Sequence, residues 1–511
     1  MGHKPRSRVD KQTEIQTIEI DGVKFDKNAL VAEVEDALEK LLRDRLDEGS
    51  DFASYEKGLM EIAREVVRQK LEKKLQAIAD SFVERLWIDH DNPAWLWEQE
   101  GTKFQYRRHA PGTVTYHSLA GPLRVQRDTY RQCNRLRGVC VPLELEAGLI
   151  ERMTPAMAKS LAIGYSYMPT RQYEEFLVTS GLQPPSRSTL DRLARDLGGY
   201  AATVHDDVEP LVRANESVDA RARSIAVGLD RTAVPMRHGE SPLDARLDER
   251  EMRRTRPTPR KRDRIRGPVQ WRMDYVGTVS LLDEAGKEVV TRKYRLPADG
   301  EPQTIVTRMI ADVRRALEQR PLSVVVVQDG APELWTLMTH ALRQEPLVSE
   351  WTEVLDWYHL DERLSSCLDL CSDARTRAAQ RKRWHDRLLG TDDGVEQVVR
   401  SLRCKRKQLE ADKAAALDVH INYLMRNKHR TRYATCKKRL LPIGSGITEG
   451  ACKSVVGVRA KRSGQRWSQR GLTAALHLRS IHQSDRFELF WSFFRRYYRA
   501  RSIVHTWGAR A

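Results

Sequence analysis

The sequence lacks several features that define whole classes of protein. No apolar run in its 511 residues approaches the roughly 18 residues that a membrane-spanning helix needs. The first residues, MGHKPRSRVDKQTE, are polar and have no apolar core of the kind found in secretory signal peptides. We therefore expect neither a membrane-embedded nor a secreted protein, and we predict a cytoplasmic location.

Cysteine is scarce and scattered. The chain has seven cysteines, an odd number without the paired spacing of a disulfide framework. Six residues separate Cys133 from Cys140, a spacing that does not match a zinc ribbon, and no second pair stands nearby. These absences indicate reduced thiols and argue against a structural zinc site at this position.

Acidic residues are in the minority. The chain has 88 Lys and Arg against 71 Asp and Glu, a formal net charge of +17 and a pI of about 9.6. A charge this far from zero attracts polyanions, and nucleic acid is the first candidate, with an anionic membrane surface as the alternative. The 40% hydrophobic content indicates a globular protein, and the length indicates three or more domains.

The hydrophobic pattern changes its period along the chain. Apolar residues recur with a helical period from Leu30 to Leu42 and from Leu59 to Phe82, which predicts a helical hairpin and a candidate oligomerisation interface. Alternation from Val114 to Val125 predicts a β-hairpin. The predicted regions are 1–100 (helical), 101–215 (β-hairpin plus helix-turn-helix-like, DNA-binding), 216–360 (first part of a catalytic core), 361–440 (helical insertion), 441–490 (last helix of the core) and 491–511 (basic C-terminal tail).

A helix, a glycine turn and a basic helix follow the predicted hairpin. The first helix is expected at Thr170–Thr179, and Pro184-Pro185-Ser186 precedes the second, RSTLDRLARDL. This outline is that of a helix-turn-helix, although an ordinary helical hairpin fits equally well. Its candidate DNA contacts are Arg187, Ser188, Arg192 and Arg195.

Three aspartates follow predicted strands in the second half of the chain. Asp230 comes after SIAVGL, Asp329 after SVVVVQ and Asp356 after the short run TEVL. The predicted order from Ser224 is strand, two-stranded hairpin, helix, strand, helix, strand, helical insertion and helix. Strand ends are where an α/β sheet opens to ligands, so these acids are candidate site residues.

The stretch LPIGSGITEGACKSVVGVRAKRSGQRW supplies a further acid. Thr448 is predicted to cap a helix through its hydroxyl, which places Glu449 in the first turn, where the helix dipole favours negative charge. We expect one long helix to continue to Arg479. The candidate DNA contacts on this stretch are Lys453, Arg459, Lys461, Arg462, Arg466 and Trp467.

Three carboxylates at element ends suit the cleavage of a phosphodiester. In-line attack needs charge neutralised at the entering and leaving oxygens, which two divalent ions about 3.5–4 Å apart achieve. Magnesium prefers oxygen ligands and keeps several waters, so a few carboxylates suffice. A structural role at a strand end fits Asp356 as well, so Asp230, Asp329 and Glu449 are predicted as the catalytic residues and as ligands of two Mg²⁺ ions, with Mn²⁺ as a substitute.

Four blocks of the sequence resemble one family. VGLDRTAVPMR, VVVVQDGAPELW, LDWYHLDERL and MRNKHRTRYATCKKRLLPIGSGITEGACKSVVGVRAKRSGQRW are similar to the characteristic blocks of bacterial insertion-sequence transposases of the ISKra type. The resemblance covers roughly Gly121 to Trp491. It implies a DDE transposase with an α/β ribonuclease-H-like catalytic domain, an α-helical insertion in that domain, and mainly helical DNA-binding regions before it.

The resemblance also assigns roles to residues. Asp230, Asp329 and Glu449 match the catalytic triad. Asp356-Trp357-Tyr358-His359 is similar to the [Cys/Asp]-x-x-His motif of Mutator-like transposases, which places Asp356 and His359 near the active site as accessory residues. Arg231 stands where the family more often has glycine, and it either crowds the metal site or contacts a phosphate.

The implied function is that of a DNA transposase, which binds terminal inverted repeats and catalyses metal-dependent strand cleavage and strand transfer. Its expected partner is double-stranded DNA, as terminal repeats and as target. A homodimer or higher homo-oligomer in the bacterial cytosol and nucleoid is expected, because two DNA ends must be paired. Two alternatives stay open: a catalytically inactive, transposase-derived DNA-binding protein, and a metal-dependent DNA nuclease.

Overall fold

The computed structural model of the chain describes residues 17–20, 23–26, 51–89, 103–133, 139–237, 269–297 and 300–504. The chain divides into two units, 1–67 and 68–511. In the first unit, β1 (Thr17–Ile20) and β2 (Val23–Asp26) form an antiparallel pair. The predicted helix from Leu30 to Leu42 lies outside the described residues, so the N-terminal helical hairpin stays a prediction.

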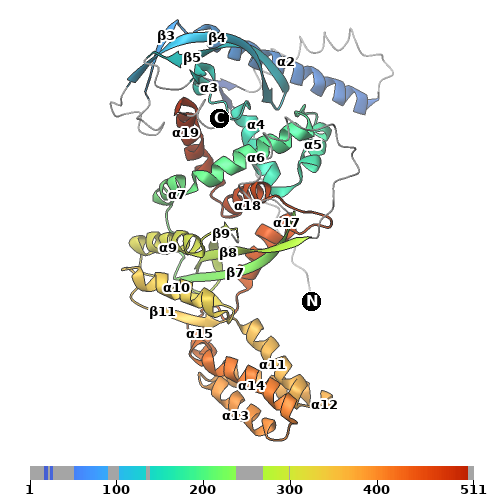
Figure 1. Cartoon of the computed structure of the whole chain (residues 1–511), viewed down its shortest axis with the longest axis vertical. Coiled ribbons are helices and arrows are strands. Elements are labelled where there is room, and N and C mark those ends of the chain that lie inside the picture. The colour runs from blue at the N-terminus through green and yellow to red at the C-terminus, as the bar shows by residue number, and fades with distance from the viewer. Residues whose placement is uncertain are drawn as a thin grey trace, which may run out of the picture. The chain divides into compact units, whose positions relative to one another are not determined.

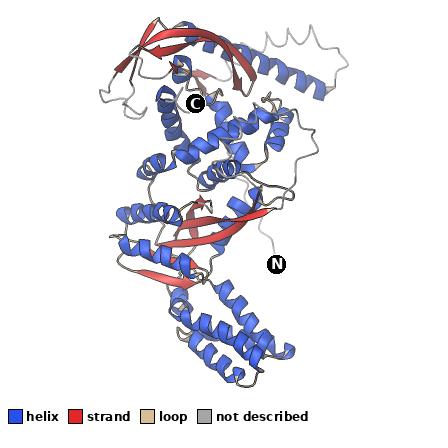
Figure 2. Cartoon of the chain, viewed as in Figure 1, coloured by secondary structure: helices blue, strands red, loops and turns tan. Residues whose placement is uncertain are grey.

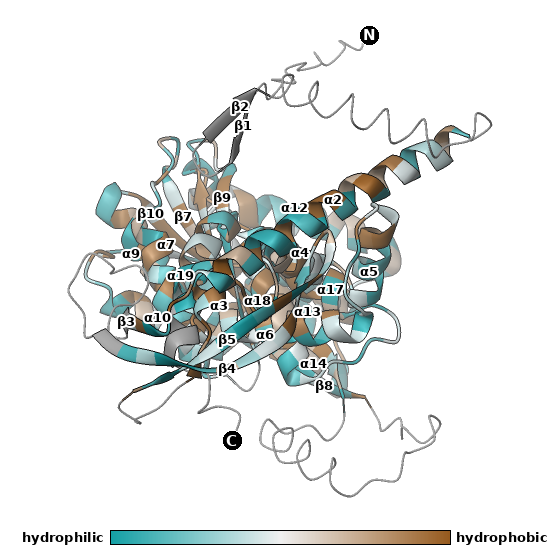
Figure 3. Ribbon diagram, turned by 90° about the horizontal axis from the view of Figure 1, so that it is seen from above, coloured by the Kyte–Doolittle hydropathy of each residue, from teal (hydrophilic) through white to brown (hydrophobic). Residues whose placement is uncertain are grey.

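The helix α2 (Phe52–Asp80) begins in the first unit and ends in the second. Figure 3 shows polar and apolar residues mixed along it. Among the described helices, none is both long and apolar enough to cross a membrane.

A four-stranded antiparallel sheet follows in the second unit, with the order β3 (Arg85–Asp89), β4 (Lys103–Ser118), β5 (Gly121–Gln132) and β6 (Val139–Cys140). The predicted β-hairpin is confirmed, but it belongs to this larger sheet, so the region before the second sheet is less helical than expected. Leu123 and Val125 pack with Leu75 and Ala79 of α2. This packing explains the alternation of buried and exposed residues along β5.

Five helices come next: α3 (Pro142–Glu146), α4 (Pro155–Tyr167), α5 (Thr170–Thr179), α6 (Arg187–Thr203) and α7 (His205–Ala214). The predicted start of α4 is confirmed, since Thr154 Oγ1 accepts a hydrogen bond from Met157 N (3.4 Å) and proline takes the first position. Gly198 of α6 lies against Ala474, with no room for a side chain. The close approach allows α6 to pack tightly on α18 (Gln469–Gln483).

A second sheet has five strands: β7 (Ser224–Met236), β8 (Gln270–Leu282), β9 (Glu288–Leu296), β10 (Ser323–Gln328) and β11 (Trp351–Leu355). Their order is β11-β10-β7-β8-β9, with β11, β10 and β7 parallel and the other pairs antiparallel. The helices α9 (Pro302–Gln319) and α10 (Pro332–Gln344) pack on one face through residues such as Met309 and Met338. The predicted order of elements is confirmed, which makes this region mixed α/β (Figure 1).

The region after β11 is helical, as Figure 2 shows. It comprises α11 (Trp357–Cys371), α12 (Ala374–Gly390), α13 (Gly394–Arg406), α14 (Ala411–Arg426), the short η1 (Lys428–Arg430) and α15 (Tyr433–Lys438). Trp384, Leu402 and Leu417 are fully buried, and they belong to one hydrophobic core that continues to Val325 and Leu355 of the sheet.

The predicted single helix up to Arg479 is wrong. The chain forms α16 (Gly446–Ala451), a π-helical turn η2 (Cys452–Gly457) and α17 (Val458–Ala460), and then an irregular segment before α18. Gly464 in that segment has a φ of 72°, which a helix does not accommodate.

The expected basic C-terminal tail is also corrected. Residues Phe487–Val504 form α19, and its Phe490, Trp491 and Phe494 are buried against the helices around α6. The aromatic residues form one face of an amphipathic helix, so burial of this face orders a segment that looked like a charged tail.

Three arginines join the C-terminal end of α4 to the elements that follow Glu449. Arg459 Nε donates to Tyr165 O (3.1 Å), Arg479 Nη1 donates to Ser166 O (3.1 Å), and Arg462 Nη2 donates to Tyr167 O (3.3 Å). These carbonyls lie in the last turn, where a helix leaves acceptors unpaired and the dipole favours cations. This arginine cap fixes the helices before the sheet to those after it.

We predict that Arg479→Met lowers stability. Arg479 is buried and donates to Ser166 O and Ser454 O. Ser454 O keeps a second donor in Gln483 Nε2 (3.2 Å), so the substitution leaves Ser166 O without its side-chain partner, at a cost of about 1–3 kcal/mol. Urea denaturation followed by circular dichroism measures the loss. Arg462→Met is the matched control, because its bond to Tyr167 is exposed and its loss should cost less than about 1 kcal/mol. Equal losses in the two variants would contradict a stabilising role of the buried cap.

Candidate active site

Three aspartates lie level with one another on three adjacent parallel strands. The register pairs Val326 of β10 with Val227 of β7, and Gln328 of β10 with Leu355 of β11. Continuing both registers by a few residues brings Asp329 level with Asp230 on one side and with Asp356 on the other. Because neighbouring strands lie about 4.8 Å apart, the three carboxylates gather at one edge of the sheet.

One detail of the predicted site is corrected. Asp230 does not end its strand: β7 continues to Met236, and Asp230 is paired in register with Val276 of β8. Asp329 and Asp356 directly follow their strands, as expected. The long β7–β8 pair therefore extends beyond the acidic edge, where β10 and β11 have already ended.

A glycine on β7 allows Glu449 to reach the same edge. A Cβ atom on Gly228 would lie 2.1 Å from Thr448 Oγ1, so only glycine permits this approach of α16 to β7. Thr448 is buried, and its hydroxyl shares a hydrogen bond of 2.7 Å with that of Thr278 on β8. Glu449, the next residue, is thus anchored beside β7 and β8.

The predicted cap of α16 is wrong. Ser445, not Thr448, is the N-cap residue, because the helix begins at Gly446. Ser445 Oγ donates to Glu449 Oε1 (3.2 Å), and Lys453 Nζ lies 3.7 Å from Oε2. Glu449 does lie in the first turn, as predicted, and these two contacts orient its carboxylate.

Asp356 and His359 form a hydrogen-bonded pair at the start of α11, in which Asp356 is buried and His359 is partly exposed. Asp356 Oδ2 accepts from both His359 N and Nδ1 at 2.8 Å, and Ser445 N donates to Oδ1 at 2.5 Å. The bond to Asp356 raises the pKa of His359 to about 9 against the opposing effect of burial, so the imidazole is a cation at neutral pH. Burial would raise the pKa of Asp356, but the bonds from His359 and Ser445 outweigh it and lower that pKa.

The electrostatic environment shows that Asp230 and Asp329 interact. Burial raises the pKa of Asp329, and the nearby Asp230 carboxylate raises it further, while His359 and Arg231 act in the opposite direction. Cys452 is a neighbour that the sequence did not indicate: its thiol lies 3.4 Å from Asp230 Oδ2 and donates to it. Burial and Asp230 raise the pKa of the Cys452 thiol, so it stays protonated.

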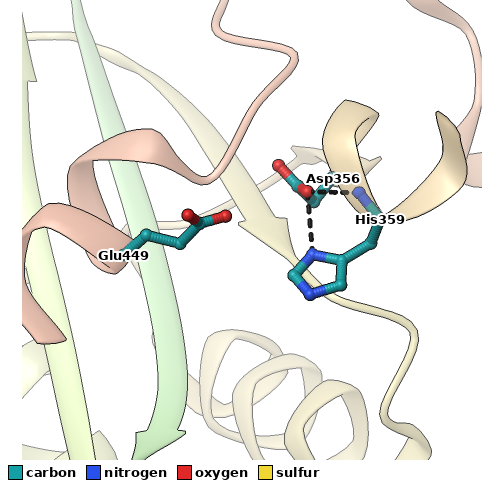
Figure 4. A group of neighbouring side chains, drawn as sticks. All are labelled: Asp356, His359 and Glu449. Atoms are coloured by element: carbon teal, nitrogen blue, oxygen red, sulfur yellow. Dashed lines mark hydrogen bonds and ion pairs between the residues drawn. The ribbon is translucent and has the colours of Figure 1, made fainter. Parts of the chain in front are cut away.

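Within the described part of the chain, one group of three side chains brings metal-ligand atoms within 4.8 Å of one another: Asp356, His359 and Glu449. Figure 4 shows Glu449 pointing from α16 toward the Asp356–His359 pair. A protonated imidazole has no lone pair for a metal, so His359 serves here as a cation until it loses its proton. The predicted set of Asp230, Asp329 and Glu449 does not form a group of this compactness.

The side chain of Arg231 does not point toward Asp230 or Asp329. Its guanidinium Nη2 pairs with Glu333 Oε1 of α10 at 2.5 Å, because side chains alternate along β7 and Arg231 faces the helix-covered side. Its backbone N–H donates to Asp230 Oδ1 (2.6 Å). Arg231 therefore orients the first aspartate through its backbone and holds its charge beside the site.

Several predicted DNA contacts have other roles. Arg459 is buried, and its guanidinium stacks on Tyr165 and Trp467 at 5.3 and 4.7 Å from the ring centres. Burial lowers the pKa of Arg459 to about 10. The prediction that Arg459 contacts DNA is wrong, because its side chain is buried within the arginine cap. Trp467 is half-buried, and its Nε1 donates to Ala460 O (3.1 Å), so it packs with the core.

The other predicted contacts divide into exposed and paired side chains. Arg187, Arg192 and Lys453 are exposed, although Arg192 lies 3.7 Å from Asp196. Arg195 pairs with Asp191 at 2.6 Å, and Lys461 Nζ donates to Thr232 Oγ1 (2.5 Å). Ser188 and Arg466 were also predicted; Ser188 is exposed, and Arg466 is half-buried. Leu190, Leu193, Leu197 and Ala201 form the buried face of α6, so its predicted DNA contacts lie on the opposite, accessible side.

Ser445 and Cys452 are the site residues that the sequence reasoning missed. Their spacing in the sequence could have indicated both residues. Ser445 lies four residues before Glu449 and Cys452 lies three residues after it, so a helix places them on the same face as Glu449. Glu333, the partner of Arg231, carries no such signal, since only the fold brings α10 to β7.

No protein-family model matches this chain, and no curated protein matches it. Among solved structures, one similar chain belongs to the Drosophila P element transposase strand transfer complex. It has 12% sequence identity and a TM-score of 0.23, over 67% of this chain and 83% of that chain. A similarity of this size carries no argument about fold or function.

Proposed function

We propose that the protein is a DNA transposase that cleaves phosphodiester bonds at the ends of a mobile element and transfers the strands to target DNA. The observation that carries the proposal is the level alignment of Asp230, Asp329 and Asp356 on three adjacent strands, with Glu449 brought to the same edge by α16. Four carboxylates converging on one open edge suit the handling of a phosphodiester with divalent ions.

We infer a ribonuclease-H-like fold for the second sheet. The strand order β11-β10-β7-β8-β9, in which β8 alone runs opposite to the other four strands, supports this inference, as does the late return of the chain through α16 and α18. In this assignment 216–360 and 441–490 form the catalytic core and 361–440 its insertion.

The donor set fits Mg²⁺. Asp230, Asp329 and Glu449 offer carboxylate oxygens, which are the hard ligands that this ion prefers. Burial, and to a smaller extent the Asp230 carboxylate, raises the pKa of Asp329, and a bound cation would favour its ionised form. When bound, two such ions, with Mn²⁺ as a substitute, would neutralise charge at the entering and leaving oxygens.

The protein's own cations flank these carboxylates. His359, held protonated by Asp356, and Lys453, beside Glu449, place positive charge where a phosphate of the bound strand would lie. Ser445 and the backbone of Arg231 fix the orientation of Glu449 and Asp230. Preorganised charges of this kind stabilise charge that develops at a reacting phosphate.

The proposed partner is double-stranded DNA, both terminal inverted repeats and target, bound through 101–215 and the basic surfaces of the second half. We propose a homodimer or higher homo-oligomer, because two DNA ends must be joined in one event. The proposed location is the bacterial cytosol and nucleoid.

We predict that Asp230→Asn, Asp329→Asn and Glu449→Gln each reduce cleavage by more than about a hundredfold, because each removes a charged ligand from the site. The assay is gel analysis of labelled DNA that carries the element ends, incubated with Mg²⁺. If the wild type cleaves the DNA and joins the products, it is a transposase. Cleavage without joining supports a nuclease, and binding without cleavage supports an inactive DNA-binding protein. Unchanged cleavage in all three variants would mean that the site is elsewhere.

We predict that Asp356→Asn lowers the pKa of His359 from about 9 toward its ordinary value of 6.5, because the hydrogen bond to Asp356 is the main cause of the shift. In the wild type, the Asp356–His359 ion pair contributes its full stabilisation of the folded state below about pH 6.5. This stabilisation is lost as the pH rises through about 9, where the imidazole loses its proton. The alkaline limb of the cleavage rate should move to lower pH in the variant. Glu362→Gln is the control, since Glu362 contributes least to the shift; an unmoved limb in Asp356→Asn would exclude a role of the imidazolium.

A further inference from the structure

One face of the helical insertion is covered with cations. In α12, Arg375, Lys382, Arg383 and Arg387 are exposed and fall within an arc of about 140° at 100° per residue. The buried Trp384 lies on the opposite side. Asp386, the only acid of this helix, is also exposed and falls within the same arc, so the face has four cations against one carboxylate.

Exposed cations also lie on α15, which is in contact with α12. Asp392, just after α12, accepts hydrogen bonds from Thr435 N (3.0 Å) and Thr435 Oγ1 (2.6 Å), which ties the start of α15 to the end of α12. Lys437 and Lys438 of α15 are exposed, and so is Arg432 just before it. We call these seven residues, Arg375, Lys382, Arg383, Arg387, Arg432, Lys437 and Lys438, the α12–α15 face.

Protein contacts do not account for these charges. Other arginines of α12 are paired, Arg377 with Asp369 (2.6 Å) and Arg381 with Asp361, whereas the α12–α15 face makes no ion pair within the described residues. Arg387, Lys437 and Lys438 lie in last helical turns, where the dipole favours cations. Lys382 and Arg383 lie in mid-helix and Arg432 outside a helix, so the dipole does not explain them.

The composition of the face indicates the class of partner. Protein interfaces are depleted of lysine at their centres, and membrane-surface helices carry large apolar residues that enter the lipid. The exposed part of α12 has no large apolar residue. A row of unpaired cations without apolar residues fits the phosphate backbone of a nucleic acid.

We propose that the α12–α15 face binds the backbone of duplex DNA, independently of sequence, outside the acidic edge. The insertion connects to the sheet directly after β11 through Asp356 and returns directly before Glu449, so a duplex held on this face stays tethered to the catalytic edge (Figure 1). The inference rests on the proposed function, to which it adds a second DNA contact that positions flanking or target DNA.

The test compares the wild type with the triple variant Lys382→Gln/Arg383→Gln/Lys437→Gln. Fluorescence anisotropy measures binding of a labelled duplex of arbitrary sequence at several KCl concentrations. Each lost phosphate contact should reduce the slope of log K against log salt by about 0.9, so a reduction up to about 2.7 is expected. Cleavage at the element ends should weaken mainly at high salt.

The matched control is Arg403→Gln/Lys407→Gln/Lys413→Gln, which removes three exposed cations at the turn between α13 and α14. Its slope should stay close to that of the wild type. An equal reduction in both triple variants would show a general charge effect and overturn the proposal. Circular dichroism melting confirms that both variants fold, which is expected for exposed side chains.

The remaining outcomes separate this proposal from the proposed function. A wild type that binds duplex DNA, with an unchanged slope in the Lys382 variant, overturns the proposal alone. A wild type that binds no duplex DNA overturns both. Binding to vesicles of anionic lipid and to single-stranded RNA is measured in the same way. If the Lys382 triple variant loses binding to one of these but keeps its binding to duplex DNA, the face belongs to that partner instead.

Discussion

The three arginines on the last turn of α4 are the contact on which the rest of the second unit depends. Arg459, Arg462 and Arg479 come from elements after Glu449, and they occupy carbonyls that a helix end leaves unpaired. Because a buried carbonyl without a partner costs free energy, the two halves of the structure hold each other in place. Glu449, ten residues before Arg459, inherits its position from this cap and from the contact of Thr448 with Gly228.

Charge at the acidic edge is only partly balanced by neighbours of opposite sign. Asp356 is fully buried, but His359 and the backbone of Ser445 compensate its charge, and Lys453 lies beside Glu449. Burial raises the pKa of Asp329, and the nearby Asp230 carboxylate raises it further. The site therefore keeps an excess of negative charge at Asp230 and Asp329, while positive charge gathers on the exposed α12–α15 face. This separation suits a protein that handles a polyanion at one place and its phosphate chemistry at another.

Much of the local structure was predictable because it depends on neighbouring residues. The Thr154-Pro155 start of α4, the β-branched run of β10 and the order of elements from β7 to α16 follow from caps, propensity and period. Local signals misled where packing overrides them. Thr448 resembles a helix cap but is drawn into the core by Thr278, and the basic aromatic C-terminal segment forms α19 because its aromatic face is buried.

The sequence by itself determined which residues are acids at element ends, and it thereby indicated Asp230, Asp329, Asp356 and Glu449 as candidates. Only the tertiary structure decided that they gather, because strand register is a long-range property that brings Asp329 level with both Asp230 and Asp356. It also decided which cations are free. Arg459 and Lys382 are both basic residues of helical segments in the sequence, but burial commits the first to the arginine cap, whereas exposure leaves the second open to a partner.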